Sequence, residues 1–134
     1  MVAGLFGAGR WYTMRADVGD GTLSAPEAAA AVASSEIILV DIRRPDEWSD
    51  TGVPQGAVPL DMRRDDFPQA LLEAMGGRKD LPVALICARG IRSGRISVRL
   101  SEAGFTQVLD VSEGMLGSRA GPGWLARGLP VTRP

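Results

Sequence analysis

The only cysteine of the chain, Cys87, stands where an apolar run meets a polar turn, in the stretch VALICARGIRSGRIS. The chain contains no histidine, so neither Ser-His nor Cys-His catalysis can be assembled within it. A single cysteine also excludes an internal disulfide and a multi-cysteine zinc site. Cys87 is therefore the one strong nucleophile, and we expect covalent chemistry on its sulfur that requires neither a metal nor a cofactor.

The residues that follow the cysteine have the types that bind an anion. Gly90 permits a tight turn, and a helix expected to begin at Ser93 would point its first backbone N–H groups at the sulfur. Arg89 and Arg92 are placed to flank the sulfur and to hold an oxyanion with paired N–H donors. An inert, buried cysteine would need none of these features. The predicted substrate-binding loop consists of Ala88, Arg89, Gly90, Ile91, Arg92 and Ser93.

Such a loop needs a strand before it and a helix after it. The run LPVALIC is continuously apolar, which is typical of a strand buried on both faces of a parallel sheet. After the loop, Ile96, Leu100 and Ala103 share one face of a helix that Gly104 should end. Arg95 and Arg99 belong to the same helix and are expected on its solvent-exposed face.

The remaining elements alternate in the same way along the chain. Helices are expected over residues 25–34, in RPDEWSD and in DDFPQALLEAMGG, and strands over residues 37–40, in AVPLD and in TQVLDV. This order predicts an α/β fold with a central, mainly parallel five-stranded sheet and helices on both faces. Ligands bind at the carboxyl edge of such sheets, which is where the predicted cysteine strand ends.

Length and charge restrict the class of protein. The 134 residues suit one domain, expected over residues 23–134 after a leader over residues 1–22. The formal net charge of −1 gives no overall field that would attract nucleic acid or an anionic membrane. No segment reaches the ~20 apolar residues that span a bilayer, and no basic residue precedes the first apolar stretch as in a signal peptide. We expect a cytoplasmic protein.

Asp41 is a candidate supporting residue. It ends the strand expected to neighbour the cysteine strand, so its carboxylate should lie near the predicted loop. A buried carboxylate there must accept hydrogen bonds, either from loop N–H groups or from an arginine. Simple pairing with Arg43 or Arg44 at the strand end is an equally good alternative.

The stretch CARGIRS resembles the active-site loop of rhodanese-like domains, Cys-x-x-Gly-x-(Arg/Thr)-Ser. Other segments resemble further parts of that family, in the same order from Leu23 to Val131: LVDIRRPDEW, TGVPQGAVPLD, LSEAGFTQVLDVSEGM and GLPV. The chain departs from the family by lacking the histidine of the Gly-His-Ile turn. It also has Met115 where we expect a second glycine and an insert, LGSRAGPG, before Trp124. These last two departures are expected near the substrate mouth, where they would affect acceptor specificity.

The resemblance implies sulfur transfer. The Cys87 thiolate would take the outer sulfur of a small anionic donor such as thiosulfate. The resulting persulfide would pass it to cyanide or to a thiol acceptor, either a small molecule or a protein. Phosphatases and arsenate reductases of the same fold use a Cys-x5-Arg loop, whereas Arg92 is the fifth residue after Cys87, one too few. A non-catalytic binding module that keeps the fold is the other alternative.

Overall fold

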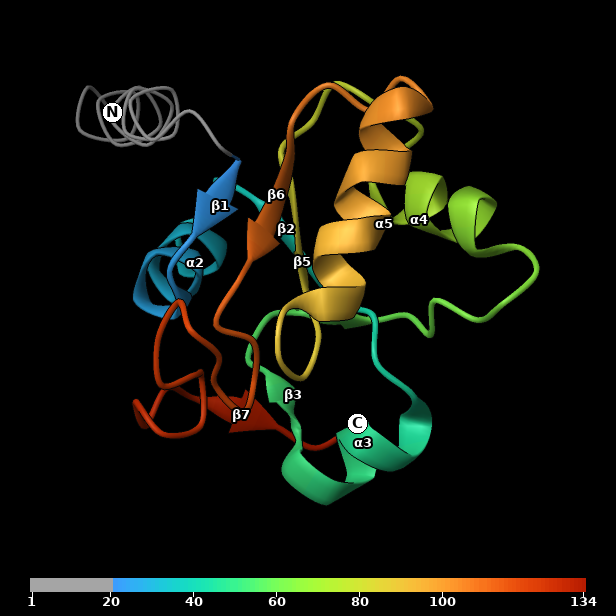
Figure 1. The fold of residues 1–134 in the computed structure, drawn as a ribbon. Coiled ribbons are helices and arrows are strands. Elements are labelled where there is room, and N and C mark those ends of the chain that lie inside the picture. Colours follow the sequence, from blue (N-terminus) through green and yellow to red (C-terminus); the bar gives the residue numbers. More distant parts are fainter. Residues whose placement is uncertain (1–20) are drawn as a thin grey trace.

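The computed structural model describes residues 21–134, which form one parallel sheet with helices on both sides (Figure 1). The sheet has five strands in the order β1-β6-β5-β2-β4, and every neighbouring pair is parallel, as predicted. Its strands are β1 (Thr22–Leu23), β2 (Ile38–Asp41), β4 (Val58–Pro59), β5 (Val83–Ile86) and β6 (Val108–Val111). The predicted leader lies outside the described residues except for its last two, of which Thr22 already pairs with β6.

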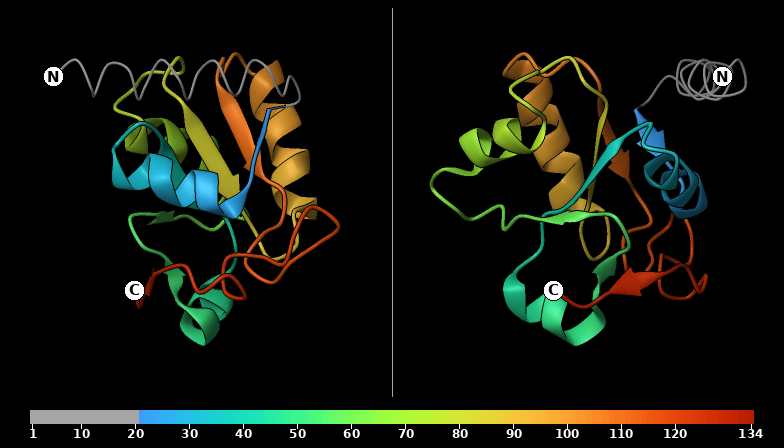
Figure 2. Two further views of the ribbon diagram at one scale, coloured as in Figure 1. Left: turned by 90° about the vertical axis from the view of Figure 1, so that its left-hand side faces the viewer. Right: turned by 180° about the vertical axis from the view of Figure 1, so that it is seen from behind.

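The helices cover the sheet as two layers, visible from two further directions in Figure 2. One layer is α2 (Ala25–Ala33), and the other holds α4 (Phe67–Ala74) and α5 (Ile91–Glu102). The start of α2 follows from its sequence, because Ser24 and Glu27 form the reciprocal capping box, with N–H to oxygen distances of 2.8 and 3.2 Å. The described chain contains no helix long and apolar enough to cross a bilayer.

Two apolar clusters hold these layers together. The first lies between α2 and the sheet, and the second between the sheet and the pair α4–α5. Strand β5 contributes to both, since all four of its residues are buried. The continuous hydrophobicity of this strand therefore has the cause expected from the sequence, burial on both faces.

A smaller unit lies beyond the carboxyl edge of the main sheet. It contains α3 (Pro45–Thr51) and an antiparallel pair, β3 (Val53–Pro54) with β7 (Val131–Thr132). In Figure 1 this unit occupies the lower part of the molecule, close to the turn that precedes α5. Neither β3 nor β7 is predicted from the sequence, because two-residue strands form only when a distant partner is present.

The glycine-rich stretch after β6 forms a series of turns. Trp124 anchors it: the indole is fully buried, and its N–H donates to the carbonyl of Pro130 at 2.9 Å. Met115 is also fully buried, within the α2-side cluster. The side chain of Met115 therefore packs in the core, while its backbone N–H donates to the carbonyl of Cys87.

Candidate active site

Strand β5 carries Cys87 to the carboxyl edge of the sheet. The strand lies between β2 and β6, with Ile86 paired to Asp41 on one side and Leu85 to Asp110 on the other. Cys87 follows directly, and only 1% of it is exposed. The cysteine therefore occupies the central position of the edge at which ligands bind in parallel sheets.

The sulfur of Cys87 lies in a cluster of hydrogen-bond donors. The backbone N–H of Gly90 donates to it at 3.2 Å, and that of Ser93 at 3.4 Å. The hydroxyl of Ser93, a fully buried residue, lies 3.4 Å from the same sulfur. Because these groups sit at the N-terminus of α5, their dipoles favour a negative charge on the sulfur or on an atom bound to it.

Helix α5 begins at Ile91, two residues before the predicted start. Gly90 precedes it with φ +83°, a left-handed conformation that residues with a side chain rarely adopt. A Cβ at Gly90 would also lie 2.2 Å from the carbonyl oxygen of Ser112. The glycine is thus required by its conformation and by the close approach of the segment after β6.

That segment fastens the predicted loop from the other side. The N–H groups of Met115 and Leu116 donate to the carbonyls of Cys87 and Ala88, both at 2.9 Å. A Cβ at Gly114 would lie 2.3 Å from the carbonyl oxygen of Ala88. Gly114, rather than position 115, is therefore where the contact between the two segments demands a glycine.

Arg92 forms a two-pronged ion pair with Glu47 of α3, with N–O distances of 2.8 and 2.9 Å. The hydrogen bonds from Arg92 lower the pKa of Glu47 to about 2, and the same bonds raise the pKa of Arg92. Charge on Cys87 also raises the pKa of Arg92, though less than Glu47 does. The N–H donors of the Arg92 guanidinium are therefore engaged by a carboxylate of α3, next to the cysteine loop.

Arg89 bonds to the glycine-rich insert. Its guanidinium donates through one nitrogen to the carbonyls of Leu116 and Gly117, at 3.3 and 3.2 Å. The side chain is exposed. It fastens the glycine-rich insert to the predicted loop while keeping other N–H donors available.

Asp41 pairs with Arg43, the simpler of the alternatives that the sequence leaves open. The two buried side chains meet through two hydrogen bonds of 2.9 and 2.8 Å, and Arg43 also donates to the carbonyl of Gly52 at 3.0 Å. Asp41 thereby links the end of β2 to the start of β3. No hydrogen bond joins it to the predicted loop among the described residues.

The other two loop residues lie at the surface of the site. Ile91 is 64% exposed, and Ala88 is half-buried. Beside the ion pair of Arg92 and Glu47 is a surface depression of about 390 Å³ that Leu116 also lines. Among the described residues, no group of histidine, cysteine, aspartate or glutamate side chains is placed to hold a metal ion.

Two carboxylates that contact the predicted loop or the segment beside it are not identified from the sequence. One is Glu47. The signal that could have found it is its position in LVDIRRPDEW, one of the segments that resemble the family. Glu113 is the other: it is buried and accepts hydrogen bonds from the N–H groups of Ala25 and Gly123 and from Arg127, at 2.9, 2.9 and 2.8 Å. Burial alone would raise the pKa of Glu113, but these hydrogen bonds keep it below its ordinary value. Glu113 holds together the segment that fastens the predicted loop.

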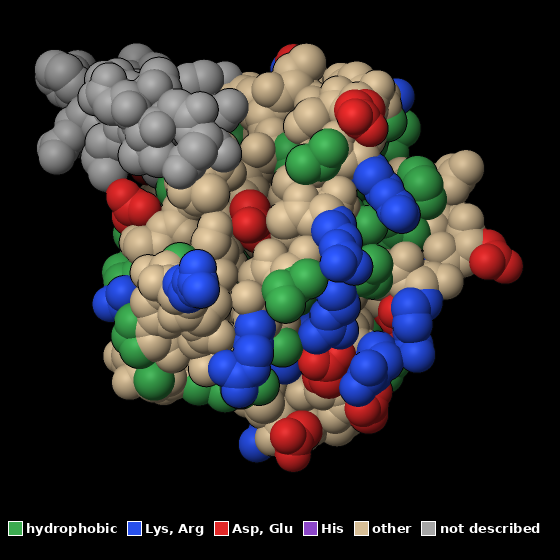
Figure 3. Space-filling model, viewed as in Figure 1, with side chains coloured by type: hydrophobic (Ala, Val, Ile, Leu, Met, Phe, Trp, Pro, Cys, Tyr) green, Lys and Arg blue, Asp and Glu red, His purple; other side chains and the backbone are tan. Residues whose placement is uncertain are grey.

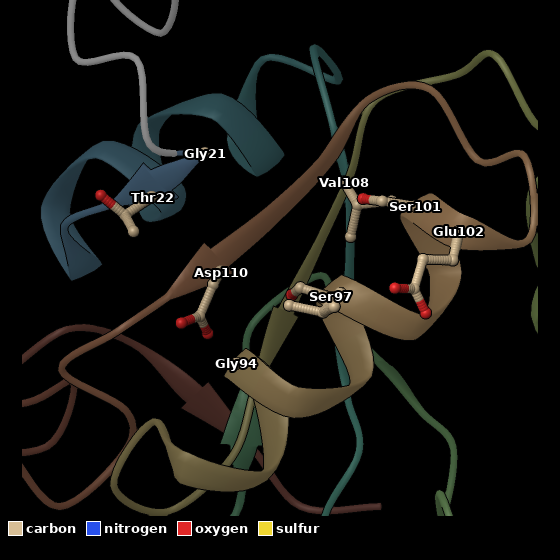
Figure 4. A pocket seen from close by; sticks show the side chains of 9 residues that line it. Gly21, Thr22, Gly94, Ser97, Ser101, Glu102, Val108 and Asp110 are labelled. Atoms are coloured by element: carbon tan, nitrogen blue, oxygen red, sulfur yellow. The ribbon is translucent and has the colours of Figure 1, made fainter.

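A second hollow lies between α5 and β1 (Figure 4). Asp110 points into it from β6 toward Gly94 and Ser97. Burial raises the pKa of Asp110, and one of its oxygens has no hydrogen-bond partner, while the other accepts from Ser112 at 3.2 Å. None of the predicted loop residues lines this hollow.

Comparison with known protein families identifies the family of this domain. A family model of the rhodanese-like domain matches residues 24–120. The chain belongs to the rhodanese-like domain family. The cysteine loop lies inside the matched range.

Solved structures show the same rhodanese-like fold. The solution structure of a polysulfide-sulfur transferase homodimer from Wolinella succinogenes matches with a TM-score of 0.65 and 27% identity, over 90% of this chain and 88% of the other. A protein from Rhodopseudomonas palustris, described as a possible tyrosine phosphatase, matches with a TM-score of 0.63 and 23% identity, over 88% and 89% of the two chains. At that identity the second likeness shows the fold alone.

A relative of known name is a tRNA uridine(34) hydroxylase from Enterobacter sp. (strain 638). It is 29% identical over 102 residues, which cover 75% of this chain but only 28% of that protein. The rhodanese-like domain described here therefore corresponds to about a quarter of that relative. Membership of the family supports a sulfurtransferase-type enzyme in general terms.

Proposed function

We propose that this protein is a sulfurtransferase that carries sulfur as a persulfide on Cys87. The observation that carries the proposal is the position of the Cys87 sulfur at the N-terminus of α5. It accepts hydrogen bonds from the backbone N–H groups of Gly90 and Ser93, with N–S distances of 3.2 and 3.4 Å. These donors favour a thiolate before the reaction and a persulfide anion after it. The chemistry needs no histidine if the sulfur already carries its charge.

The first step balances with an anionic donor such as thiosulfate. The Cys87 thiolate attacks the outer sulfur of thiosulfate, a new S–S bond forms, and the old S–S bond breaks with its electron pair leaving on sulfite. In the second step a thiolate attacks the outer sulfur of the persulfide, and the Cys87 thiolate is the leaving group. A small anionic donor and a thiol acceptor are thus the expected partners, with Arg92 and Arg89 near enough to attract the negative charge of the donor.

A phosphatase is disfavoured by the same loop. Arg92 follows Cys87 by five residues instead of the six of a Cys-x5-Arg loop, and its guanidinium is paired with Glu47. An oxyanion cradle would need that guanidinium for the substrate. The protein should therefore leave p-nitrophenyl phosphate intact.

The test is the intact mass of the protein after incubation with thiosulfate. The wild type should gain the mass of one sulfur atom, and cyanide or dithiothreitol should remove it. Cys87→Ser should gain nothing, and no other cysteine can confuse the result. A wild-type protein that stays unmodified by thiosulfate, polysulfide and mercaptopyruvate would refute the enzyme and favour a binding module.

A further inference from the structure

Exposed apolar side chains gather near the cysteine loop. Of the large hydrophobic residues exposed in the described part of the chain, Ile91 and Val98 are 64% and 59% exposed on α5, and Leu116 is 43% exposed in the segment bonded to the loop. Ile91 and Val98 are seven residues apart, so they lie two helical turns apart on one face, about 10 Å along the axis. A small inorganic donor does not need an apolar strip of that length.

Arginines without acidic partners lie on the same helix. Seven described arginines form ion pairs with carboxylates: Arg43, Arg44, Arg63, Arg64, Arg78, Arg92 and Arg127. Arg95 and Arg99 are exposed and have no carboxylate partner among the described residues. In the space-filling view, basic side chains follow the course of α5 with apolar ones beside them (Figure 3).

This local charge contrasts with the composition of the whole chain. The formal net charge is −1, yet α5 carries three arginines and a single acidic residue, Glu102 at its last position. Unpaired positive charge beside exposed apolar side chains attracts and orients an acidic protein, and the apolar contacts then hold it. Arginine at such a surface contributes more often to binding than most other residues.

We propose that the exposed face of α5, formed by Ile91, Arg95, Val98 and Arg99, docks an acidic protein whose thiol receives the sulfur from Cys87. This rests on the proposed function. Since the Cys87 sulfur lies at the N-terminus of α5, a partner lying along the helix has one end beside the cysteine loop. The partner's thiolate attacks the outer sulfur, the S–S bond to Cys87 breaks, the Cys87 thiolate departs, and the partner leaves as a persulfide.

The experiment compares two peptides as acceptors. One consists of glutamate, leucine and a single cysteine, and the other has lysine in place of every glutamate. With the Cys87 persulfide formed in advance, the acidic peptide should take sulfur at least about tenfold faster at low salt, and added salt should reduce the difference. Dithiothreitol serves as the uncharged acceptor to which both rates are compared.

Variants of the helix locate the effect. Exchanging both Arg95 and Arg99 for glutamate should abolish or invert the preference for the acidic peptide. Val98→Ser should slow transfer to the acidic peptide in a way that salt does not change. The control is Arg119→Glu, which reverses an exposed arginine that also has no carboxylate partner but lies in the glycine-rich insert, so the preference should persist.

A binding measurement separates this proposal from the enzyme activity. A fluorescent acidic peptide with serine in place of cysteine should bind the wild type more tightly than the double glutamate variant, by anisotropy, even if no persulfide ever forms. Equal transfer and equal binding for the two peptides would overturn the proposal. So would binding of anionic phosphatidylserine vesicles that depends on Arg95 and Arg99 without any peptide preference, since the face would then belong to a membrane.

Discussion

Replacing Gly90 by alanine should damage the protein much more than the same replacement at Gly76. Both glycines have positive φ, +83° and +67°. Alanine in this conformation costs about 1–2 kcal/mol at either position. The surroundings differ, because an added Cβ at Gly76 meets nothing within 4 Å, whereas at Gly90 it meets the carbonyl oxygen of Ser112 at 2.2 Å.

The additional cost at Gly90 follows from that contact. Carbon and oxygen atoms approach to about 3.3 Å at closest, so one of the two backbone segments must move by about 1 Å. Such a movement weakens the hydrogen bonds that Met115 and Leu116 donate to the cysteine loop. Two hydrogen bonds at about 0.5–1.5 kcal/mol each bring the expected loss for Gly90→Ala to about 2–5 kcal/mol, against about 1–2 kcal/mol for Gly76→Ala.

Urea unfolding followed by tryptophan fluorescence measures both losses. Under conditions where both variants are folded, thiosulfate should load Cys87 in Gly76→Ala as in the wild type. In Gly90→Ala it should do so more slowly, because the N–H of Gly90 is itself a donor to the sulfur. Equal destabilisation by the two substitutions, with equal loading, would refute the reasoning from the loop contact.

The remaining predictions concern the charged residues. Glu47 has a pKa lowered from 4.5 to about 2, so its pairing with Arg92 stabilises the folded state above pH 4.5 and this contribution is lost as the pH falls toward 2. Glu47→Gln should cost about 1 kcal/mol at pH 7 and progressively less as the pH falls from 4.5 toward 2, by urea unfolding; a loss independent of pH would contradict this. Asp41→Asn leaves the buried guanidinium of Arg43 without its counter-charge and should cost about 3–5 kcal/mol, measured in the same way; an unchanged midpoint would remove the pair from the stability argument. Arg89→Ala should raise the KM for thiosulfate about tenfold with kcat unchanged, as measured by steady-state kinetics. A wild-type KM would show that Arg89 does not bind the donor and only forms hydrogen bonds to the insert.

The strand, the nucleophile and the turn that follows could be predicted because each depends on neighbours in the sequence. Continuous apolar residues before Cys87 indicate burial on both faces of a sheet, and Gly90 and the helical period after it indicate the anion-binding turn. The capping box at Ser24 is equally local and is present in the structure. Patterns of this kind need only the geometry of a single strand or helix.

Other features depend on which segments meet after folding, and local patterns carry no information about that. From the sequence, Arg92 is expected to be an unpaired cation of the loop. In the structure, α3 places Glu47, 45 residues away in the chain, beside its guanidinium. The pairing of β3 with β7 needs two segments that lie far apart in the chain, Val53–Pro54 and Val131–Thr132, to meet. Gly90 reads as a turn residue from the sequence alone. Only the tertiary structure shows that the carbonyl of Ser112 approaches it so closely that no side chain fits, because that approach is set by the packing of β6 beside β5.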